Sequence, residues 1–140
     1  MTLPLSGERW GMSEPRRDVL ITGANRGIGL ELTRHYLTQG VRVVATCRKP
    51  EALGALANLA DAFGESLRIE RLDVTSEESI QALLGALNGM VFDLLLSNAG
   101  VCEEEMFGEW TKDSWGETLA VNVTGPALLA QAMAPLMRAG

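Results

Sequence analysis

A glycine-rich turn between an apolar strand and an amphipathic helix limits the folds open to this chain more than any other feature. Val19–Thr22 is a short, apolar, β-branched run, as expected of a strand buried on both faces. The turn Gly23–Gly29 follows, and apolar residues then recur at helical spacing up to Gly40, where a helix C-terminal glycine is expected. A strand, a tight turn and a helix in this order predict a parallel sheet, because the helix carries the chain back to the edge where the strand began.

The same alternation continues along the rest of the chain. Further strands are predicted over residues 41–47, 67–72 and 92–96. Helices are predicted from Pro50 to about Phe63, from a Thr75–Glu78 capping box onward, from Thr111 through Leu119, and from about Pro126 to Met137. Connections of this length give parallel strands with right-handed crossovers. We therefore expect an α/β fold, a Rossmann-type doubly wound parallel sheet that is incomplete, with about four strands in the order 3-2-1-4.

Composition limits the partners that this chain can have. A net charge of -6 over 140 residues argues against nucleic acid as the main partner, because phosphate backbones need a cationic field. The two cysteines, Cys47 and Cys102, lack metal-ligand spacing, so we expect no metal site. Free thiols outside a disulfide framework are typical of a reducing compartment, which leads us to expect a cytoplasmic protein.

We expect neither a membrane span nor a signal peptide in this chain. No continuous apolar run approaches the roughly 20 residues that cross a bilayer. Residues 1–12 contain Glu8, Arg9 and two glycines where a signal peptide needs an apolar stretch. We therefore expect no membrane partner, a disordered tail at residues 1–17 and one domain at residues 18–140.

The glycine turn also indicates a ligand. Glycines let the backbone come close to a pyrophosphate, and the following helix N-terminus offers N–H groups and positive partial charge. No Gly-Lys-Ser/Thr sequence follows, so the turn is not a phosphate loop of the ATPase kind. Glycine spacing of this kind also occurs in turns that bind nothing, and further signals are needed.

The end of the second predicted strand supplies one such signal. An acidic residue about 20 positions beyond the glycines usually binds the free ribose 2′-hydroxyl of NAD. The residue 20 positions after Gly29 is Lys49, which follows Arg48. The first carboxylate after the strand end is Glu51. Two cations without a carboxylate favour a 2′-phosphate, and hence NADP(H), with Arg26 as a second contact. The alternative is a solvated basic turn.

Four segments together resemble the short-chain dehydrogenase/reductase family over about residues 18–140. Thr22–Gly29 matches its Thr-Gly-x-x-x-Gly-x-Gly spacing, Asp73-Val74 its Asp-Val pair, Ser97–Gly100 its Asn-Asn-Ala-Gly motif, and Asn122 its helix asparagine. The sequence is most similar to carbonyl-reductase-like and C-factor-like members, which share TGANRGIG and a TCR strand end. Ser97 replaces the family's first Asn, a change that removes some sheet hydrogen bonds and leaves the pocket.

The resemblance implies a role for each matched residue. Asp73 would accept a hydrogen bond from the adenine amino group, the Val74 backbone would face the ring, and Asn98 and Ala99 would border the adenosine ribose. The cofactor-binding residues so expected are Thr22, Gly23, Asn25, Arg26, Gly27, Ile28, Gly29, Arg48, Asp73, Val74, Asn98, Ala99 and Gly100. Asn122 is the one expected catalytic residue, at a helix irregularity where its backbone holds a water of the proton relay; an asparagine before a Thr-Gly-Pro helix break is the alternative.

The family's catalytic Ser-Tyr-Lys set is absent from this sequence. A tyrosine there donates the proton, a lysine four residues later lowers its pKa, and a serine positions the carbonyl. The only tyrosine, Tyr36, is followed four residues later by Gly40, and no serine, tyrosine or lysine follows Asn122. We therefore expect either the N-terminal portion of a longer reductase or a natural short form.

The resemblance thus implies an NADP(H)-dependent oxidoreductase acting on a small carbonyl or alcohol, present here as its cofactor-binding half. The alternative is a non-catalytic dinucleotide-binding or dimerisation module. The last predicted helix is the one that this family packs across a dimer interface, so a homo-oligomer formed through it is a further expectation. Trp110 and Trp115, at near-helical spacing, are expected as packing residues.

Overall fold

A four-stranded parallel sheet in the order β3-β2-β1-β4 forms the centre of the computed structural model, which describes residues 17–102 and 106–139. The strands are β1 (Asp18–Ile21), β2 (Arg42–Cys47), β3 (Leu67–Arg71) and β4 (Leu94–Leu96). All three pairings are parallel. The predicted fold class and strand order are therefore confirmed, whereas the predicted tail falls almost entirely outside the described residues.

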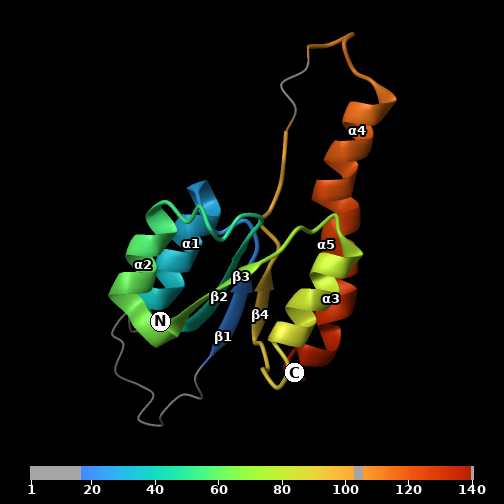
Figure 1. Ribbon diagram of the computed structural model, residues 1–140. Coiled ribbons are helices and arrows are strands. Elements are labelled where there is room, and N and C mark those ends of the chain that lie inside the picture. Colours follow the sequence, from blue (N-terminus) through green and yellow to red (C-terminus); the bar gives the residue numbers. More distant parts are fainter. Residues whose placement is uncertain (1–16, 103–105, 140) are drawn as a thin grey trace, which may run out of the picture.

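Helices lie on both faces of this sheet (Figure 1). On one face lie α1 (Gly27–Thr38) and α2 (Ala55–Phe63), and on the other α3 (Glu77–Ala86) and α5 (Gly125–Met133). The remaining helix, α4 (Lys112–Leu119), continues the line of α5 beyond the sheet (Figure 1). The sheet is thus covered on both sides, as a parallel sheet requires.

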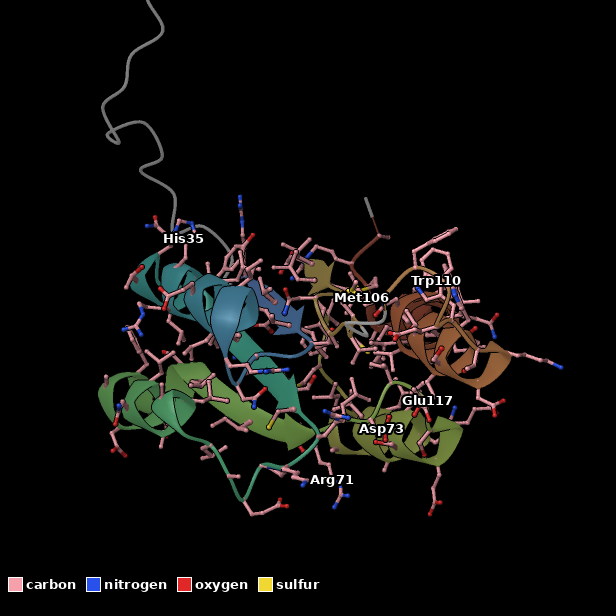
Figure 2. The ribbon with its side chains drawn as sticks, turned by 90° about the horizontal axis from the view of Figure 1, so that it is seen from above. His35, Arg71, Asp73, Met106, Trp110 and Glu117 are labelled. Atoms are coloured by element: carbon pink, nitrogen blue, oxygen red, sulfur yellow. The ribbon has the colours of Figure 1, made fainter. Side chains whose placement is uncertain are left out.

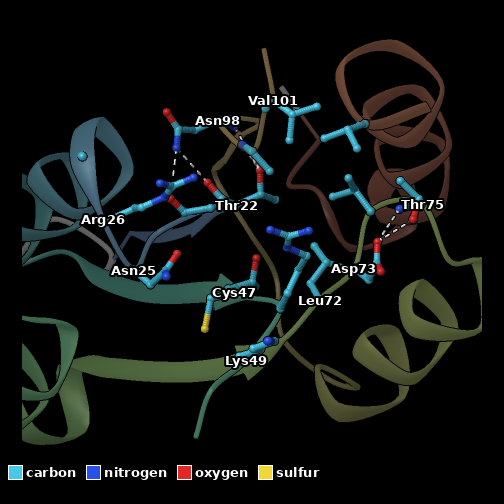
Figure 3. A pocket seen from close by; sticks show the side chains of 18 of the residues that line it. Thr22, Asn25, Arg26, Cys47, Lys49, Leu72, Asp73, Thr75, Asn98 and Val101 are labelled. Carbon is cyan, nitrogen blue, oxygen red and sulfur yellow. Dashed lines mark hydrogen bonds between the residues drawn. The ribbon is translucent and has the colours of Figure 1, made fainter. Parts of the chain in front are cut away.

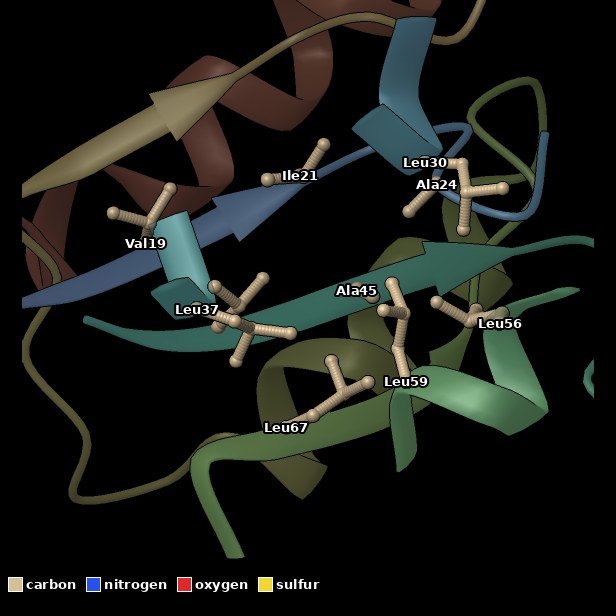
Figure 4. Packing of buried hydrophobic residues seen from close by; sticks show 10 residues of the cluster. Val19, Ile21, Ala24, Leu30, Leu37, Ala45, Leu56, Leu59 and Leu67 are labelled. Atoms are coloured by element: carbon tan, nitrogen blue, oxygen red, sulfur yellow. The ribbon is translucent and has the colours of Figure 1, made fainter. Parts of the chain in front are cut away.

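The alternation of side chains along the strands divides the core into two layers. Val19 and Ile21 pack with Leu30 and Leu37 of α1 and with the apolar side of α2 (Figure 4). Leu20, between them, faces α3 and α5 on the other side. Successive strand residues point to opposite faces, so the apolar run of β1 is buried throughout, with all of its residues 5% exposed or less.

Two predicted helix starts are wrong. Helix α2 begins at Ala55, not Pro50, because Gly54 adopts a positive φ of 52° that ends the preceding turn. The predicted Thr75–Glu78 capping box does not form: the hydroxyl of Ser76 caps α3 by accepting from the Ser79 backbone N at 3.1 Å. The Thr75 hydroxyl is directed instead to the carboxylate of Asp73.

The last two predicted helices are one continuous helical run. The run starts after Thr111, close to the predicted position, and Thr111 caps it through a capping box with Ser114. The π-helical turn η2 (Ala120–Thr124) then joins α4 to α5, and the short 3₁₀ turn η3 (Ala134–Leu136) follows. Pro126 lies in the first turn of α5 and does not begin a separate helix. A π turn of this kind realigns the backbone around a residue that cannot donate its N–H.

This run, Lys112–Leu136, is long and apolar enough by length and composition to cross a membrane. Its residues Leu129 and Met133 are fully buried in the layer that they share with α3 and the sheet. At least one face of the helix is therefore occupied by the protein's own core.

The chain after η3 returns to the outer edge of the sheet, beside β4, and forms one isolated β-bridge there. This bridge is parallel and joins Phe92 to Met137. The Phe92 N–H donates to Leu136 O and the Arg138 N–H to Phe92 O, both at 2.8 Å. Strand β4 begins at Leu94, two residues later than predicted, and Phe92 forms its bridge with Met137 on the outer side.

Candidate functional site

The residues that follow each strand enclose a cavity of about 770 Å³ at the carboxyl edge of the sheet (Figure 3). It lies where the strand order reverses between β1 and β4, the place where open α/β sheets bind ligands. Its lining includes every cofactor-binding residue expected from the sequence except Gly29. The structure therefore brings these residues together, and their roles in binding stay predictions.

Two glycines of the turn are held at distances that no side chain allows. A Cβ at Gly23, where φ is +64°, would lie 2.9 Å from the Cα of Ala99. A Cβ at Gly29 would lie 2.1 Å from the carbonyl oxygen of Gly23 and 2.5 Å from Nδ2 of Asn98. Gly29 thus lets α1 start close against the turn, which explains why it does not line the cavity itself.

Thr22 and Asn98 join the segment after β1 to the segment after β4. The buried Thr22 hydroxyl oxygen accepts from the backbone N–H groups of Asn98 at 3.0 Å and Ala99 at 2.9 Å. In return, Nδ2 of Asn98 donates to the carbonyl oxygens of Thr22 at 3.1 Å and Gly23 at 3.2 Å (Figure 3). These four bonds fix one wall of the cavity in a single arrangement.

Positive charge dominates the described lining of the cavity. Arg26 comes from the glycine turn, Arg48 and Lys49 from the end of β2, and Asp73 is the only carboxylate among these residues. The first turn of α1 contains no acidic residue to oppose its N-terminal partial charge. This arrangement favours a ligand that carries several negative charges.

Asp73 is held as an ionised carboxylate. Its Oδ1 accepts from the Thr75 hydroxyl at 2.6 Å and from the Thr75 backbone N–H at 2.9 Å (Figure 3). These two bonds, aided by the positive charges of Arg48 and Arg71, lower the pKa of Asp73 below its ordinary value. The cavity therefore keeps a hydrogen-bond acceptor beside its cations at neutral pH.

Cys47 is a lining residue that sequence reasoning did not place in the site. Burial raises the pKa of its thiol, so the group stays protonated and forms part of the wall. Other lining residues that were not predicted are Thr46, Ala52, Leu72, Thr75, Val101 and Val121. Most stand at or just after a strand end, which was the signal available in the sequence.

Asn122 lies in η2 and does not line the cavity. Its Oδ1 accepts from the Val101 N–H at 2.8 Å, and its Nδ2 donates to the Val101 carbonyl at 2.7 Å. The helix irregularity implied by the resemblance is therefore present, and the side chain fastens the segment after β4 to the long helix. A catalytic role for Asn122 stays a prediction.

The two expected packing tryptophans lie at the surface and not in the core. Trp110 and Trp115 are 52% and 45% exposed. Edge-to-face contacts join Phe107 to Trp110 and Trp110 to Trp115, with ring centroids 5.5 and 5.7 Å apart. Trp115 belongs to α4, Trp110 lies beside that helix (Figure 2), and none of the three aromatic residues lines the cavity.

Comparison with known proteins agrees with this geometry. The family model described as short chain dehydrogenase matches residues 17–140. The short chain dehydrogenase gsfK of Penicillium aethiopicum is 37% identical over 125 residues, which are 86% of this chain and 50% of that protein. The NADP-dependent 3-hydroxy acid dehydrogenase YdfG of Escherichia coli K12 is 33% identical, over 85% of this chain and 48% of its own length.

Solved structures give the same result. The NADPH-bound carbonyl reductase from chicken fatty liver has a TM-score of 0.79 at 36% identity, covering 86% of this chain and 51% of that one. A carbonyl reductase from Pseudomonas aeruginosa PAO1 in complex with NADP has a TM-score of 0.80 at 29% identity, over 86% and 56% of the two chains. The chain spans half or less of the length of the curated relatives named above. It belongs to the short-chain dehydrogenase/reductase family, of which it covers the N-terminal portion.

Proposed function

We propose that this chain binds NADP(H) in the cavity at the carboxyl edge of the sheet. The observation that carries this proposal is the set of three cations, Arg26, Arg48 and Lys49, around a cavity whose β2 end offers no carboxylate. A carboxylate at that point would favour NAD, whereas guanidinium and ammonium groups favour the additional phosphate of NADP(H).

The residues of the site fit such a cofactor. The approach of Gly23 and Gly29 to neighbouring backbone leaves room for a diphosphate against the N-terminus of α1. Arg48 and Lys49 would bind the 2′-phosphate, and Asp73 would accept from the adenine amino group. Relatives are named for NADP or were solved with NADP(H), which supports the same cofactor here.

We further propose that the chain acts as the cofactor-binding half of an oxidoreductase for a small carbonyl or alcohol. NADPH supplies a hydride when bound. Among the described residues no tyrosine lines the cavity, since Tyr36 lies in α1. The part of this chain is therefore to hold and orient the nucleotide, and the names of its relatives, carbonyl reductase and 3-hydroxy acid dehydrogenase, indicate the substrate class.

Titration of the purified chain with NADPH, followed by nicotinamide fluorescence, tests this proposal. We expect saturable binding that is tighter for NADPH than for NADH. No binding of either nucleotide would refute it.

A second candidate is a binding and dimerisation module without turnover, and the outer side of the long helix favours it. Trp115, Leu119 and Val123 follow each other at four-residue spacing and are 45–57% exposed. Such an apolar ridge is typical of helix–helix contacts between copies. We propose that two copies associate through it. Sedimentation should then show a dimer for the wild type and a monomer for Leu119→Asp, and a monomeric wild type would contradict this.

A further inference from the structure

Helix α5 contacts the loop that carries Asp73 and Val74 through a glycine that does not line the cavity. Gly125 is the first residue of that helix and is buried. A Cβ on it would lie 2.6 Å from the carbonyl oxygen of Val74 and 3.0 Å from the carbonyl carbon. Both atoms are backbone and cannot turn aside like the end of a flexible side chain. Helix α5 therefore rests directly on the backbone of this loop.

A hydroxyl from α3 holds the same loop at its other residue. The backbone N–H of Asp73 donates to Oγ of Ser79 at 2.9 Å. Ser79 lies in the first turn of α3. Neither Ser79 nor Gly125 lines the cavity, whereas Asp73 and Val74, the two residues that they hold, both do.

Helix α5 is anchored in the core beyond this contact, so we expect the loop to move and the helix to stay in place. Leu129 and Met133, about one and two turns further along α5, are both 0% exposed in the core. An ordinary contact needs about 3.4 Å, so a Cβ at position 125 requires a displacement of about 0.8 Å. Displacement of this size moves the Val74 carbonyl and the adjacent Asp73 carboxylate within the cavity.

We propose that Gly125 and Ser79 are positioning residues that set the place of the nucleotide base by fixing Asp73 and Val74 from outside the cavity. This inference rests on the proposed NADP(H) site. It predicts that a change at either residue alters recognition of the adenine amino group without touching the nucleotide.

Gly125→Ala tests the proposal, with Gly116→Ala as the matched control. Both glycines lie in the same long helix, and a Cβ at Gly116 has no atom within 4 Å. NADPH and its deamino analogue, in which hypoxanthine replaces adenine, are titrated by nicotinamide fluorescence. We expect Gly125→Ala to weaken NADPH binding about tenfold and to lose the preference over the deamino analogue, while Gly116→Ala stays within about twofold of wild type.

The possible outcomes separate this inference from the proposed function. If the wild type binds neither nucleotide, the proposed function fails. If it binds NADPH and Gly125→Ala behaves like Gly116→Ala, or weakens both nucleotides equally, the positioning role is overturned.

Should Gly125→Ala fail to fold, as judged by circular dichroism, Ser79 decides the question. Ser79→Ala removes the acceptor for the Asp73 N–H, and Ser79→Thr keeps a hydroxyl at the same place. We expect the first to lose the preference for NADPH over the deamino analogue and the second to restore it. An unchanged preference in Ser79→Ala would overturn the proposal.

Discussion

The proposed preference of the cavity for NADP(H) depends on single charged side chains. Arg48 and Lys49 follow β2 at the position where NAD-binding Rossmann domains in general place an acid, and Arg26 comes from the glycine turn. Asp73 is the one carboxylate of the described lining, and its hydrogen bonds with Thr75 keep it ionised.

Replacement of Arg48 by aspartate should weaken NADPH binding by about tenfold to a hundredfold and should not weaken NADH binding, because a carboxylate at this point favours NAD. The reason for the weaker NADPH binding is the loss of a charge-assisted hydrogen bond to the 2′-phosphate, worth about 1.5–3 kcal/mol. Fluorescence titration with both nucleotides measures it. Arg34→Asp, on the outer side of α1, makes the same change of charge away from the cavity and should affect neither. Equal losses for NADPH and NADH in Arg48→Asp would refute the assignment.

Asp73 should stabilise the fold in a pH-dependent way. Its pKa is lower in the folded chain than the ordinary 3.8, so the folded state holds the charge where the unfolded state takes up a proton. The stabilisation is therefore fully present above about pH 4 and is lost as pH falls through the folded pKa. Urea unfolding at a series of pH values should show a smaller loss of stability upon acidification for Asp73→Asn than for the wild type. Parallel curves would contradict the lowered pKa.

At the scale of elements, the glycine turn was predictable, and several helix boundaries were not. The strand, turn and helix around Gly23 and Gly29 follow from local apolar periodicity and glycine spacing. The start of α2 depends on the backbone of Gly54, and the cap of α3 depends on which of two neighbouring hydroxyls, Thr75 or Ser76, bonds to Asp73. Thr75 forms that bond, and the N–H of Asp73 donates to Ser79 in the first turn of α3, a pair of contacts that the capping-box pattern does not predict.

The residues of the candidate site were likewise predictable only in part. Residues with a motif, such as Asn98, were predicted and line the cavity. Cys47 and Val101 were not among the expected site residues, and they line the cavity because the parallel register places every strand end at one edge. The amide clamp of Asn122 on Val101 joins residues 21 positions apart and had no signal in the sequence beyond the helix irregularity.

Gly29→Ala should destabilise the fold, because the added methyl group would overlap the Gly23 carbonyl. We expect a loss of about 1–3 kcal/mol in the free energy of unfolding measured in urea. Gly85→Ala in α3, where a Cβ meets open space, is the control and should raise stability by about 0.5–1 kcal/mol. A Gly29→Ala variant as stable as the control would contradict the close contact between Gly29 and the Gly23 carbonyl.

At the level of the whole molecule, an ion pair and hydrogen bonds to carboxylates stabilise the amino edge of the sheet, opposite the cavity at the carboxyl edge. Asp18, buried at the start of β1, forms an ion pair with Arg42 of β2. Asp93 accepts from the Asp18 N–H at 2.9 Å and from Nε of Arg138 at 2.6 Å. These bonds join β1, β2, the approach to β4 and the segment after η3 on the side opposite the cavity.

Loss of the Asp93 carboxylate should therefore loosen the whole molecule without changing the site. We expect Asp93→Ala to lower the free energy of unfolding by about 1–3 kcal/mol, because a backbone N–H and a guanidinium lose their acceptor. Nucleotide affinity, measured on the folded variant, should stay at the wild-type value. A fall in affinity with unchanged stability would contradict this division between the two edges.

The central claim is that the end of β2 binds a phosphate on the adenosine ribose. Isothermal titration calorimetry with 2′,5′-ADP and 5′-AMP tests it most directly, because the two ligands differ only in that phosphate. The account predicts that the chain binds 2′,5′-ADP at least about tenfold more tightly, and that the difference shrinks as salt is added. Equal affinity for the two ligands would contradict it.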